Sequence, residues 1–426
     1  MMTVRGSVLS ASVVTPPVSQ AQDVVIRDRA PPPRRGLVPL SADPITEGHL
    51  DLIRAARAQC AEVVVLIAEN DGKRGSYCFT LAERAVLAMR AIAHAGIDRV
   101  RVTTTDRLLV DAYLREGCAV IFRGVRNAAD RTTDEAQMRL HAAILPGIDD
   151  HVVYVPARAE RVHVSSTMVK AFVAHDVDVS SYVPAFVKQA LEERIRQQWR
   201  IAVTGGVASG KSWVASHLAQ HIPEHHGVPA THIDLDQLQR ELFEEDSAGA
   251  QFVRDGLAAL FGVRVLAHGG RMVERRVLKE TLLLTDGCSP EQRVAAHKLV
   301  QPHIERKLRE ALHGARGVVF LEWAQLAEMQ LGQWTNHHAI VVDTPDRAIF
   351  AKCRGITDAE QAAIARYQWS TDRKADALEA CARSAGCGRV LRYVHRSAST
   401  ATDLPVLAKE LLTWLPTMRS LRSSVP

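Results

Sequence analysis

The segment from Gly205 to Ser212 constrains the fold of this chain more than any other. It reads Gly-Gly-Val-Ala-Ser-Gly-Lys-Ser, follows the apolar run 200–204 directly and precedes a helical pattern over 213–221. Glycines let backbone N–H groups turn inward around phosphate oxygens, and a helix that begins there adds its positive dipole. A strand, a glycine-rich loop and a helix in this order predict a phosphate-binding loop in a parallel α/β sheet.

The residues of this loop and of the next strand end predict its chemistry. Lys211 can reach the terminal phosphates of a nucleotide, and the Ser212 hydroxyl can ligate Mg²⁺. In Ile233-Asp234-Leu235-Asp236, a carboxylate can accept a proton from a hydroxyl or orient the metal, but an Asp there is also a good helix N-cap. We predict Lys211 and Asp236 as catalytic and Ser212 and Asp236 as metal-binding. The predicted nucleotide-binding residues are Gly205, Gly206, Val207, Ala208, Ser209, Gly210, Lys211, Ser212 and Asp234.

Strands and helices also alternate in the first half of the chain. The run 63–68 is typical of a buried parallel strand, and the pattern continues with a helix at 81–95, a strand at 99–103, a helix at 106–116 and a strand at 119–122. A helix is expected from Pro184 to Gln198, so we place a boundary near Trp199. The fold class is therefore α/β, with two doubly wound parallel-sheet domains. We expect a flexible tail at 1–35, a first domain at 36–198 and a second at 199–426.

Composition excludes several classes of protein. With 47% hydrophobic and 24% charged residues, the chain should form well-buried hydrophobic cores. The excess of 53 Lys+Arg over 48 Asp+Glu is too small to indicate a nucleic-acid-binding surface. No stretch reaches the roughly 18 apolar residues of a membrane span. The seven cysteines are scattered without a CxxC pair, which favours reduced thiols and a cytoplasmic protein. A transit peptide in the tail is an alternative that Asp23 and Asp28 oppose.

A second set of motifs lies in the first domain. The segment 41–49 ends in Thr46-Glu47-Gly48-His49, which places an imidazole at a helix start, where it can donate to a phosphate and where Gly48 permits close approach. The alternative is a capping turn with an incidental histidine. Arg123-Gly-Val-Arg126 follows a strand, at the edge where α/β sheets bind ligands. Lys73 and the hydroxyls of 165–167 would lie on the same rim, although each could be a cap or a solvated charge.

Residues 200 to about 370 resemble the dephospho-CoA kinase family. The resemblance rests on the loop with IDLD, on 273–278, on Gln-Pro-His-Ile at 301–304 and on Phe-Leu-Glu at 320–322. It implies phosphorylation of the ribose 3'-hydroxyl of dephospho-CoA by ATP. The lid region departs from the family, with Arg354 and Arg366 as candidates for phosphate clamping or as exposed helix-face residues. The adenine-side motif is not recognisable over 382–395.

Residues 36–195 resemble the bacterial-type phosphopantetheine adenylyltransferase family, whose pattern is [ST]FDPIT-x-GH, Lys, RG-L-R, Glu and ISSS. The resemblance implies that His49 and Ser41 stabilise the pentavalent phosphorus, that Lys73 holds substrate phosphates and that the arginines bind ATP. Departures include Ala42 in place of Phe and the missing Asn-Arg pair after residue 135. The predicted catalytic residues are His49, Lys73 and Arg123, and the predicted binding residues are Ser41, Thr46, Gly48, Arg126, Asp134, Ser165, Ser166, Thr167 and, in the second domain, Arg354.

The two implied reactions are consecutive. A bifunctional CoA synthase would adenylylate 4'-phosphopantetheine with ATP and then phosphorylate the dephospho-CoA product, with Mg²⁺ in both halves. We expect neither nucleic acid nor membrane as a partner, and a homo-oligomer is compatible with this picture. The alternative is a nucleotidyltransferase of another pathway, such as nicotinamide nucleotide metabolism, whose P-loop domain is regulatory.

Overall fold

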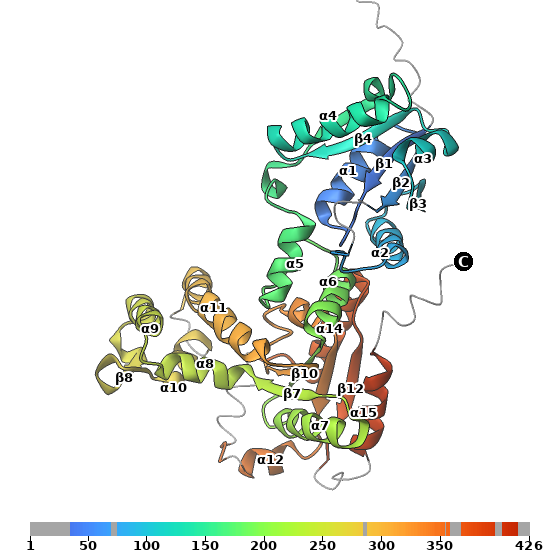
Figure 1. Cartoon of the computed structure of the whole chain (residues 1–426). Helices are drawn as coiled ribbons and strands as arrows, with labels where there is room; N and C mark the ends of the chain where they lie inside the picture. Colours follow the sequence, from blue (N-terminus) through green and yellow to red (C-terminus); the bar gives the residue numbers. More distant parts are fainter. Residues whose placement is uncertain are drawn as a thin grey trace, which may run out of the picture. The chain divides into compact units, whose positions relative to one another are not determined.

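The computed structural model describes residues 35–69, 75–283, 288–353, 355–357, 368–396 and 403–415. They form two α/β domains, each built on one five-stranded parallel sheet (Figure 1). The predicted fold class is therefore confirmed. The predicted tail falls on residues that the structure does not describe, apart from Arg35, which begins the first strand. No helix in the described ranges combines the length and the apolar composition that a bilayer crossing requires.

The first sheet has the strand order β3-β2-β1-β4-β5. The chain moves outward from β1 to β3 and then returns to the other side of β1, so the direction reverses between β1 and β4. In such sheets ligands bind at the carboxyl ends of the strands beside this reversal. The elements are β1 (Arg35–Leu40), α1 (Glu47–Arg57), β2 (Glu62–Ala68), α2 (Leu81–His94), β3 (Val100–Thr105), α3 (Leu109–Arg115), β4 (Val120–Val125), α4 (Ala128–Ala142), η2 (Ile148–His151), β5 (Val152–Pro156), η3 (Ala159–Arg161), α5 (Ser166–Ala174), α6 (Ala185–Leu191) and η4 (Glu192–Arg196).

Helices cover both faces of this sheet because apolar side chains alternate along its central strands. Val63 and Val65 face a core that they share with α1, α2, α5 and α6. Their neighbours Val64 and Leu66 face the opposite core, which contains side chains of α3 and α4.

The second sheet has the order β12-β11-β6-β10-β7, with β6 in the centre. The phosphate-binding loop follows β6 directly, as the sequence predicted. The elements are β6 (Gln198–Gly205), α7 (Lys211–His226), β7 (Ala230–Asp234), α8 (Leu235–Glu244), α9 (Ala248–Phe261), η5 (Val263–Val265), β8 (Leu266–Ala267), η6 (His268–Gly270), β9 (Met272–Val273), α10 (Arg275–Leu283), α11 (Pro290–His313), β10 (Gly317–Glu322), η7 (Gly332–Thr335), β11 (Ala339–Asp343), α12 (Arg347–Cys353), α14 (Thr371–Ala385), β12 (Val390–Val394) and α15 (Asp403–Thr413).

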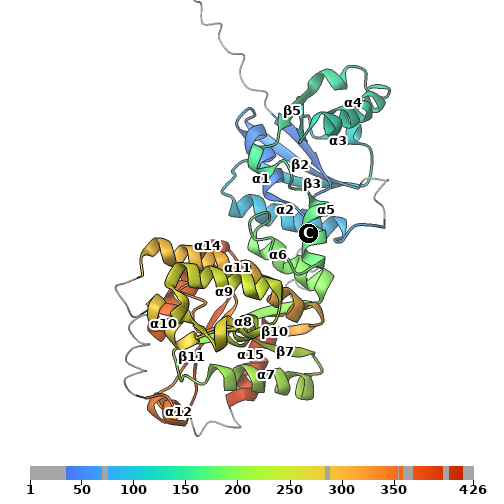
Figure 2. The ribbon, with the colours of Figure 1, turned by 90° about the vertical axis from the view of Figure 1, so that its left-hand side faces the viewer.

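This sheet is also covered on both faces. Val318 and Phe320 of β10 pack with α7 and α15, whereas Val319 and Leu321 pack with the group α8 to α11. Figure 2 shows α7 and α15 on one side of the sheet and α8, α11 and α14 on the other. The antiparallel pair β8 and β9 belongs to the α8 to α11 group.

The junction between the two sheets has no linker. The sequence predicted one helix up to Gln198, but α6 continues as the π-helix η4 and ends at Arg196. Gln197 takes a left-handed conformation with φ of 54°, which stops the helix, and Gln198 already belongs to β6. The helix that ends the first domain therefore runs through one residue into the strand that carries the phosphate loop.

Buried charges fix this junction. Lys188 of α6 is 1% exposed, and its Nζ donates to the Gln333 carbonyl at 2.6 Å and to Asn336 Oδ1 at 3.2 Å. The same Nζ lies 3.2 Å from Glu192 Oε1, while Asn336 Nδ2 donates to Glu192 Oε2 at 2.6 Å. Arg200 of β6 pairs with Glu192 at 3.1 Å. Residues of α6, η4, β6 and the segment after η7 thus share one polar network.

We expect Lys188→Ala to lower the free energy of unfolding by about 3 kcal/mol or more, because it leaves buried acceptors without their donor and removes one of the two cations paired with Glu192. Urea unfolding of the whole chain measures the change. Arg131→Ala serves as the control, since Arg131 and Glu135 form an exposed pair on α4 and its loss should cost under about 1 kcal/mol. Equal costs for the two variants would contradict the structural importance of the junction network.

Candidate functional site

The first candidate site centres on His49 in the first turn of α1. The Thr46 backbone N–H donates to His49 Nδ1 at 3.0 Å, and the Thr46 hydroxyl lies 3.1 Å from the same nitrogen. Because a backbone N–H can only donate, Nδ1 accepts, and the proton of the neutral imidazole sits on Nε2. The ring therefore does cap the helix, as the alternative interpretation held. The group it can offer to a phosphate oxygen is Nε2–H.

The loop before α1 is held by a buried carboxylate. Asp43 is 4% exposed, and its two oxygens accept the backbone N–H groups of 78 and 79 at 3.0 Å each. Lys170 of α5 donates to Asp43 at 2.6 Å, and the Ser166 hydroxyl donates to the Pro44 carbonyl at 2.8 Å. These bonds bring the start of α5 against the loop that leads to His49.

The three predicted hydroxyls at the start of α5 do different things. Ser165 caps the helix by accepting the Met168 N–H at 3.1 Å, and Ser166 is used in the bond to Pro44. Thr167 is exposed. The first-turn backbone N–H groups, rather than the serine hydroxyls, are what this helix start can offer to an anion.

Arg123 lies at the carboxyl end of β4 within a cluster of polar groups. Its Nε donates to Asp134 Oδ1 at 2.7 Å, and a second nitrogen contacts the same oxygen. Tyr154 stands opposite Arg123 on β5, and its pKa is raised by burial and by the Asp134 charge. Burial and the Arg123 charge lower the pKa of His141. Tyr154 and His141 were not predicted, although His141 follows Asp134 by seven residues, two turns of α4.

Arg126 is also held by a carboxylate of α4. Its guanidinium donates to Asp130 at 2.7 and 3.1 Å, and this bond lowers the pKa of Asp130. Gly124, between the arginines, lets α1 pack closely, since a Cβ there would lie 3.3 Å from Leu52 Cδ2. Both arginines are therefore oriented before a nucleotide binds, and phosphate oxygens would compete with carboxylates for them.

These contacts gather the predicted residues at one edge of the first sheet. Ser41, Thr46 and Gly48 follow β1, the arginines end β4, and α5 is tied to the β1 loop. Arg84 of α2, which was not predicted, is fully buried and donates to the Ser41 carbonyl at 2.6 Å and to the Ala68 carbonyl at 3.0 Å. It joins the ends of β1 and β2. Lys73 lies outside the described residues.

The second candidate site is the phosphate loop after β6. Gly205 must lack a side chain, because a Cβ would lie 2.3 Å from the Val342 carbonyl oxygen of β11. Gly210 caps α7 with φ of 86°, and a Cβ there would lie 2.2 Å from the His395 ring. The Val207 N–H donates to Gln368 Oε1 at 3.2 Å. The loop is thus shaped by close contacts with segments that follow it in the chain.

Glu322 of β10 connects the loop to the neighbouring strand. It is 3% exposed, and its oxygens accept the Ser212 hydroxyl at 2.6 Å and His232 Nε2 at 2.9 Å. Burial alone would raise the pKa of Glu322, but the bonds from His232 and Ser212 and the Lys211 charge bring it below its usual value. The sequence matched Glu322 to a family motif without giving it a role.

The two aspartates of the IDLD segment have different positions in the structure. Asp234 pairs in register with Glu322 and caps α8, accepting the Asp236 N–H at 2.9 Å. Burial, with the charges of Glu322 and Asp236, raises its pKa. Asp236 lies in the first turn of α8. The capping role that the sequence left open thus belongs to Asp234. Arg354 and Arg366 lie outside the described residues.

Among the described residues, no group of three or more His, Cys, Asp or Glu side chains could hold a metal ion by itself. The oxygen donors beside the loop are nevertheless of the kind that Mg²⁺ prefers. This ion is usually bound by one or two protein oxygens together with substrate phosphates. Ser212 and the nearby carboxylates fit that pattern.

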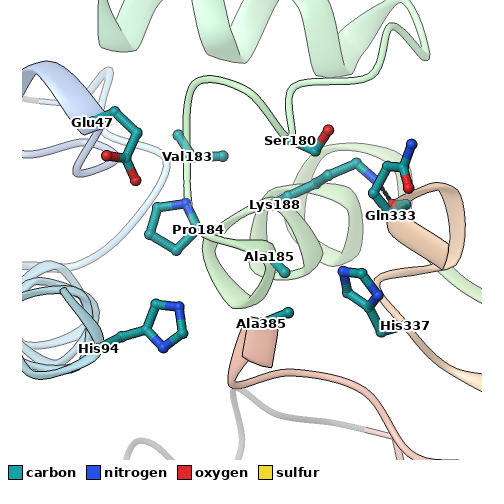
Figure 3. A pocket seen from close by; sticks show the side chains of 10 residues that line it. All are labelled: Glu47, His94, Ser180, Val183, Pro184, Ala185, Lys188, Gln333, His337 and Ala385. Carbon is teal, nitrogen blue, oxygen red and sulfur yellow. Dashed lines mark hydrogen bonds between the residues drawn. The ribbon is translucent and has the colours of Figure 1, made fainter. Parts of the chain in front are cut away.

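A cavity of about 310 Å³ borders the first candidate site at Glu47, which stands between the predicted residues Thr46 and Gly48. Its lining includes His94, Pro184, Lys188 and His337, and Figure 3 shows Lys188 reaching past the cavity to the Gln333 carbonyl. No residue predicted for either site lines this cavity. We therefore assign this cavity to neither of the two candidate phosphate-binding sites.

Known proteins resemble the two domains separately. Residues 199–381 match the family model described as dephospho-CoA kinase, and residues 40–172 match the cytidylyltransferase-like model. A phosphopantetheine adenylyltransferase of Clavibacter michiganensis is 41% identical over 163 residues, 38% of this chain and 97% of the relative. One of Limosilactobacillus reuteri is 35% identical over 167 residues, 39% of this chain and 92% of the relative.

Two solved structures are also similar. A protein of Thermus thermophilus is 25% identical, with 52% of this chain and 99% of that chain covered and a TM-score of 0.38. A NadR protein in complex with NAD and AMP-PNP is 11% identical, with 90% and 96% covered and a TM-score of 0.30.

We expect Gly210→Ala to lower the free energy of unfolding far more than Gly227→Ala. Both glycines have a left-handed backbone, and they flank the same helix, Gly210 before α7 and Gly227 after it. A Cβ at Gly227 meets nothing within 4 Å, so that variant carries only the backbone cost of about 1 kcal/mol. At Gly210 the overlap with buried His395 should add about 1–3 kcal/mol and weaken ATP binding. Urea unfolding and nucleotide titration measure both. Indistinguishable variants would contradict the tight loop geometry.

Proposed function

We propose that this chain, which belongs to the phosphopantetheine adenylyltransferase family through its first domain, catalyses the last two steps of coenzyme A biosynthesis. A dephospho-CoA kinase domain follows the first domain. In the first step, a phosphate oxygen of 4'-phosphopantetheine attacks the α-phosphorus of ATP, and pyrophosphate leaves. In the second, ATP phosphorylates the ribose 3'-hydroxyl of the dephospho-CoA product. The observation that carries the proposal is that one chain is similar to both families, and the reactions that they imply are consecutive.

Adenylyl transfer of this kind needs positioning and charge stabilisation but no covalent nucleophile. We assign His49 Nε2–H to the oxygen of the α-phosphate, where negative charge grows in the transition state. Arg123 and Arg126 would bind ATP phosphates after exchanging their carboxylate partners. Lys73 stays a prediction for the substrate phosphates.

In the second domain the loop N–H groups and Lys211 would hold the phosphates of ATP. Asp236 is the predicted base for the ribose hydroxyl. The raised pKa of Asp234 also suits a group that takes up a proton, although one of its oxygens already caps α8. Mg²⁺, when bound by Ser212 and Asp236 together with the nucleotide, would neutralise charge on the transferring phosphoryl group. The domain limits of 36–198 and 199–426 belong to this proposal.

We expect the wild-type chain to convert 4'-phosphopantetheine, ATP and Mg²⁺ into coenzyme A, and the Lys211→Ala chain to stop at dephospho-CoA, because only the second site would lose its phosphate contact. Mass spectrometry identifies the products. Nicotinamide mononucleotide, offered in place of phosphopantetheine, should not be adenylylated. If the wild-type chain stops at dephospho-CoA, the kinase assignment is wrong. If it adenylylates nicotinamide mononucleotide but not phosphopantetheine, the assignment to coenzyme A biosynthesis is wrong.

We expect His49→Ala to slow pyrophosphate release by about 100-fold or more while phosphorylation of supplied dephospho-CoA continues at the wild-type rate. His49→Gln keeps an acceptor for the Thr46 N–H, so it separates loss of chemistry from loss of the helix cap. His163→Ala, an exposed histidine of the same domain, is the control. A near-normal rate in His49→Ala would exclude His49 from the mechanism.

A further inference from the structure

Helix α12 presents one face to the phosphate loop. Arg347 and Phe350 are three residues apart and so lie side by side on this helix. A Cβ at Gly206 would lie 2.7 Å from a terminal nitrogen of Arg347, which places the guanidinium against the backbone of the loop. The Phe350 ring stacks on His395 at 5.2 Å, and His395 fills the space beside Gly210. Arg347 thus meets the loop directly at Gly206, and Phe350 is connected to Gly210 through His395.

The Arg347 side chain is anchored from behind. One of its terminal nitrogens donates to Asp343 Oδ1 at 2.8 Å, and the Thr371 hydroxyl donates to the same oxygen at 3.2 Å. The other terminal nitrogen is the one that lies at Gly206. The side chain is 38% exposed, so part of it is open to solvent. An arginine held in this way loses little freedom when it binds an anion.

We propose that Arg347 is a nucleotide-binding residue of the second domain, which contacts the polyphosphate of the nucleotide held by the loop. The proposal rests on the proposed kinase function. A guanidinium can bind two phosphate oxygens at once, and a polyphosphate seated on residues 205–212 brings its negative charge next to Gly206. The arginines predicted from the sequence for this task, Arg354 and Arg366, lie further along the chain.

A purely structural role for Arg347 makes a different prediction. As an exposed pair, Asp343 and Arg347 are spaced four residues apart and would contribute little to stability. If the pair were only a surface ion pair, its removal would leave nucleotide affinity unchanged. If Arg347 instead held the shape of the loop, its removal would weaken the binding of ATP and AMP equally, because the effect would not depend on the number of phosphates.

The test is titration of the full chain with ATP, ADP and AMP in the presence of Mg²⁺, by calorimetry. The first domain should bind ATP too, so the signal of the loop site is the part of the isotherm that the Lys211→Ala chain loses. At this site we expect Arg347→Ala to raise the Kd for ATP about 10-fold or more, with a smaller effect for ADP and the smallest for AMP. Arg347→Lys should restore part of the affinity.

Arg392→Ala is the matched control, because Arg392 is a similarly exposed arginine of the same domain that pairs with Asp372, Asp376 and Glu379. The Kd of the Arg392→Ala chain for ATP at the loop site should stay within about twofold of the wild-type value. An Arg347→Ala chain that binds ATP like the wild type, or that loses ATP and AMP affinity equally, would overturn the proposal. A wild-type chain with no Lys211-dependent site would overturn it together with the kinase function. If the Arg347 effect is present but dephospho-CoA is never phosphorylated, the kinase function fails and Arg347 remains a nucleotide ligand.

Discussion

The buried charges between residues 176 and 200 are the constraint on which the rest of the structure depends. Asp176 is paired with Arg196 and Arg200 at 2.8 Å each, and Glu192 is paired with Lys188 and Arg200. Charges removed from water to this degree are tolerated only when every partner is in place. The helix, the turn at Gln197 and the strand β6 must therefore form together. Since β6 ends in the phosphate loop, the position of that loop follows from the same network.

Both candidate sites are prepared by contacts that exist without a ligand. In the first domain the arginines are held by carboxylates of α4, and His49 is fixed in one tautomer by a backbone N–H. In the second, Ser212 is held by Glu322, and Arg347 by Asp343. Ligand groups oriented beforehand lose less entropy on binding. The cost is that phosphate oxygens must compete with carboxylates, which favours polyanions over singly charged ligands.

Much of the fold could be predicted from the sequence because it depends on local patterns. The strand expected at 63–68 is β2 from Glu62 to Ala68, and the helix expected at 81–95 is α2 from Leu81 to His94. The glycine loop was placed correctly between a strand and a helix. These features are set by residues within a few positions of one another. The helix expected up to Gln198 ends earlier because Gln197 takes a left-handed conformation. The sequence did not predict this end, since no glycine marks the turn.

The side chains that sequence reasoning missed are those whose partners lie far away in the chain. Burial and the Asp134 charge raise the pKa of Tyr154, burial and the Arg123 charge lower the pKa of His141, and Arg347 is defined by Gly206, which lies more than a hundred residues earlier. Spacing within one segment cannot reveal such pairs. The predicted roles of Asp234 and Ser165 met the same limit, since a cap and a ligand use the same residue types.

The absence of any linker at Gln197 bears on the ancestry of the chain. Joined domains usually retain a stretch of sequence in which recombination can exchange one partner for another. Here a crossover anywhere between Lys188 and Arg200 would separate buried charges from the residues that pair with them or hydrogen-bond to them, including Asn336 far downstream. A descendant carrying a different second domain would inherit unpaired buried ions and fold poorly. The two halves should therefore have diverged as a single lineage since their union, with their substitutions at this boundary correlated.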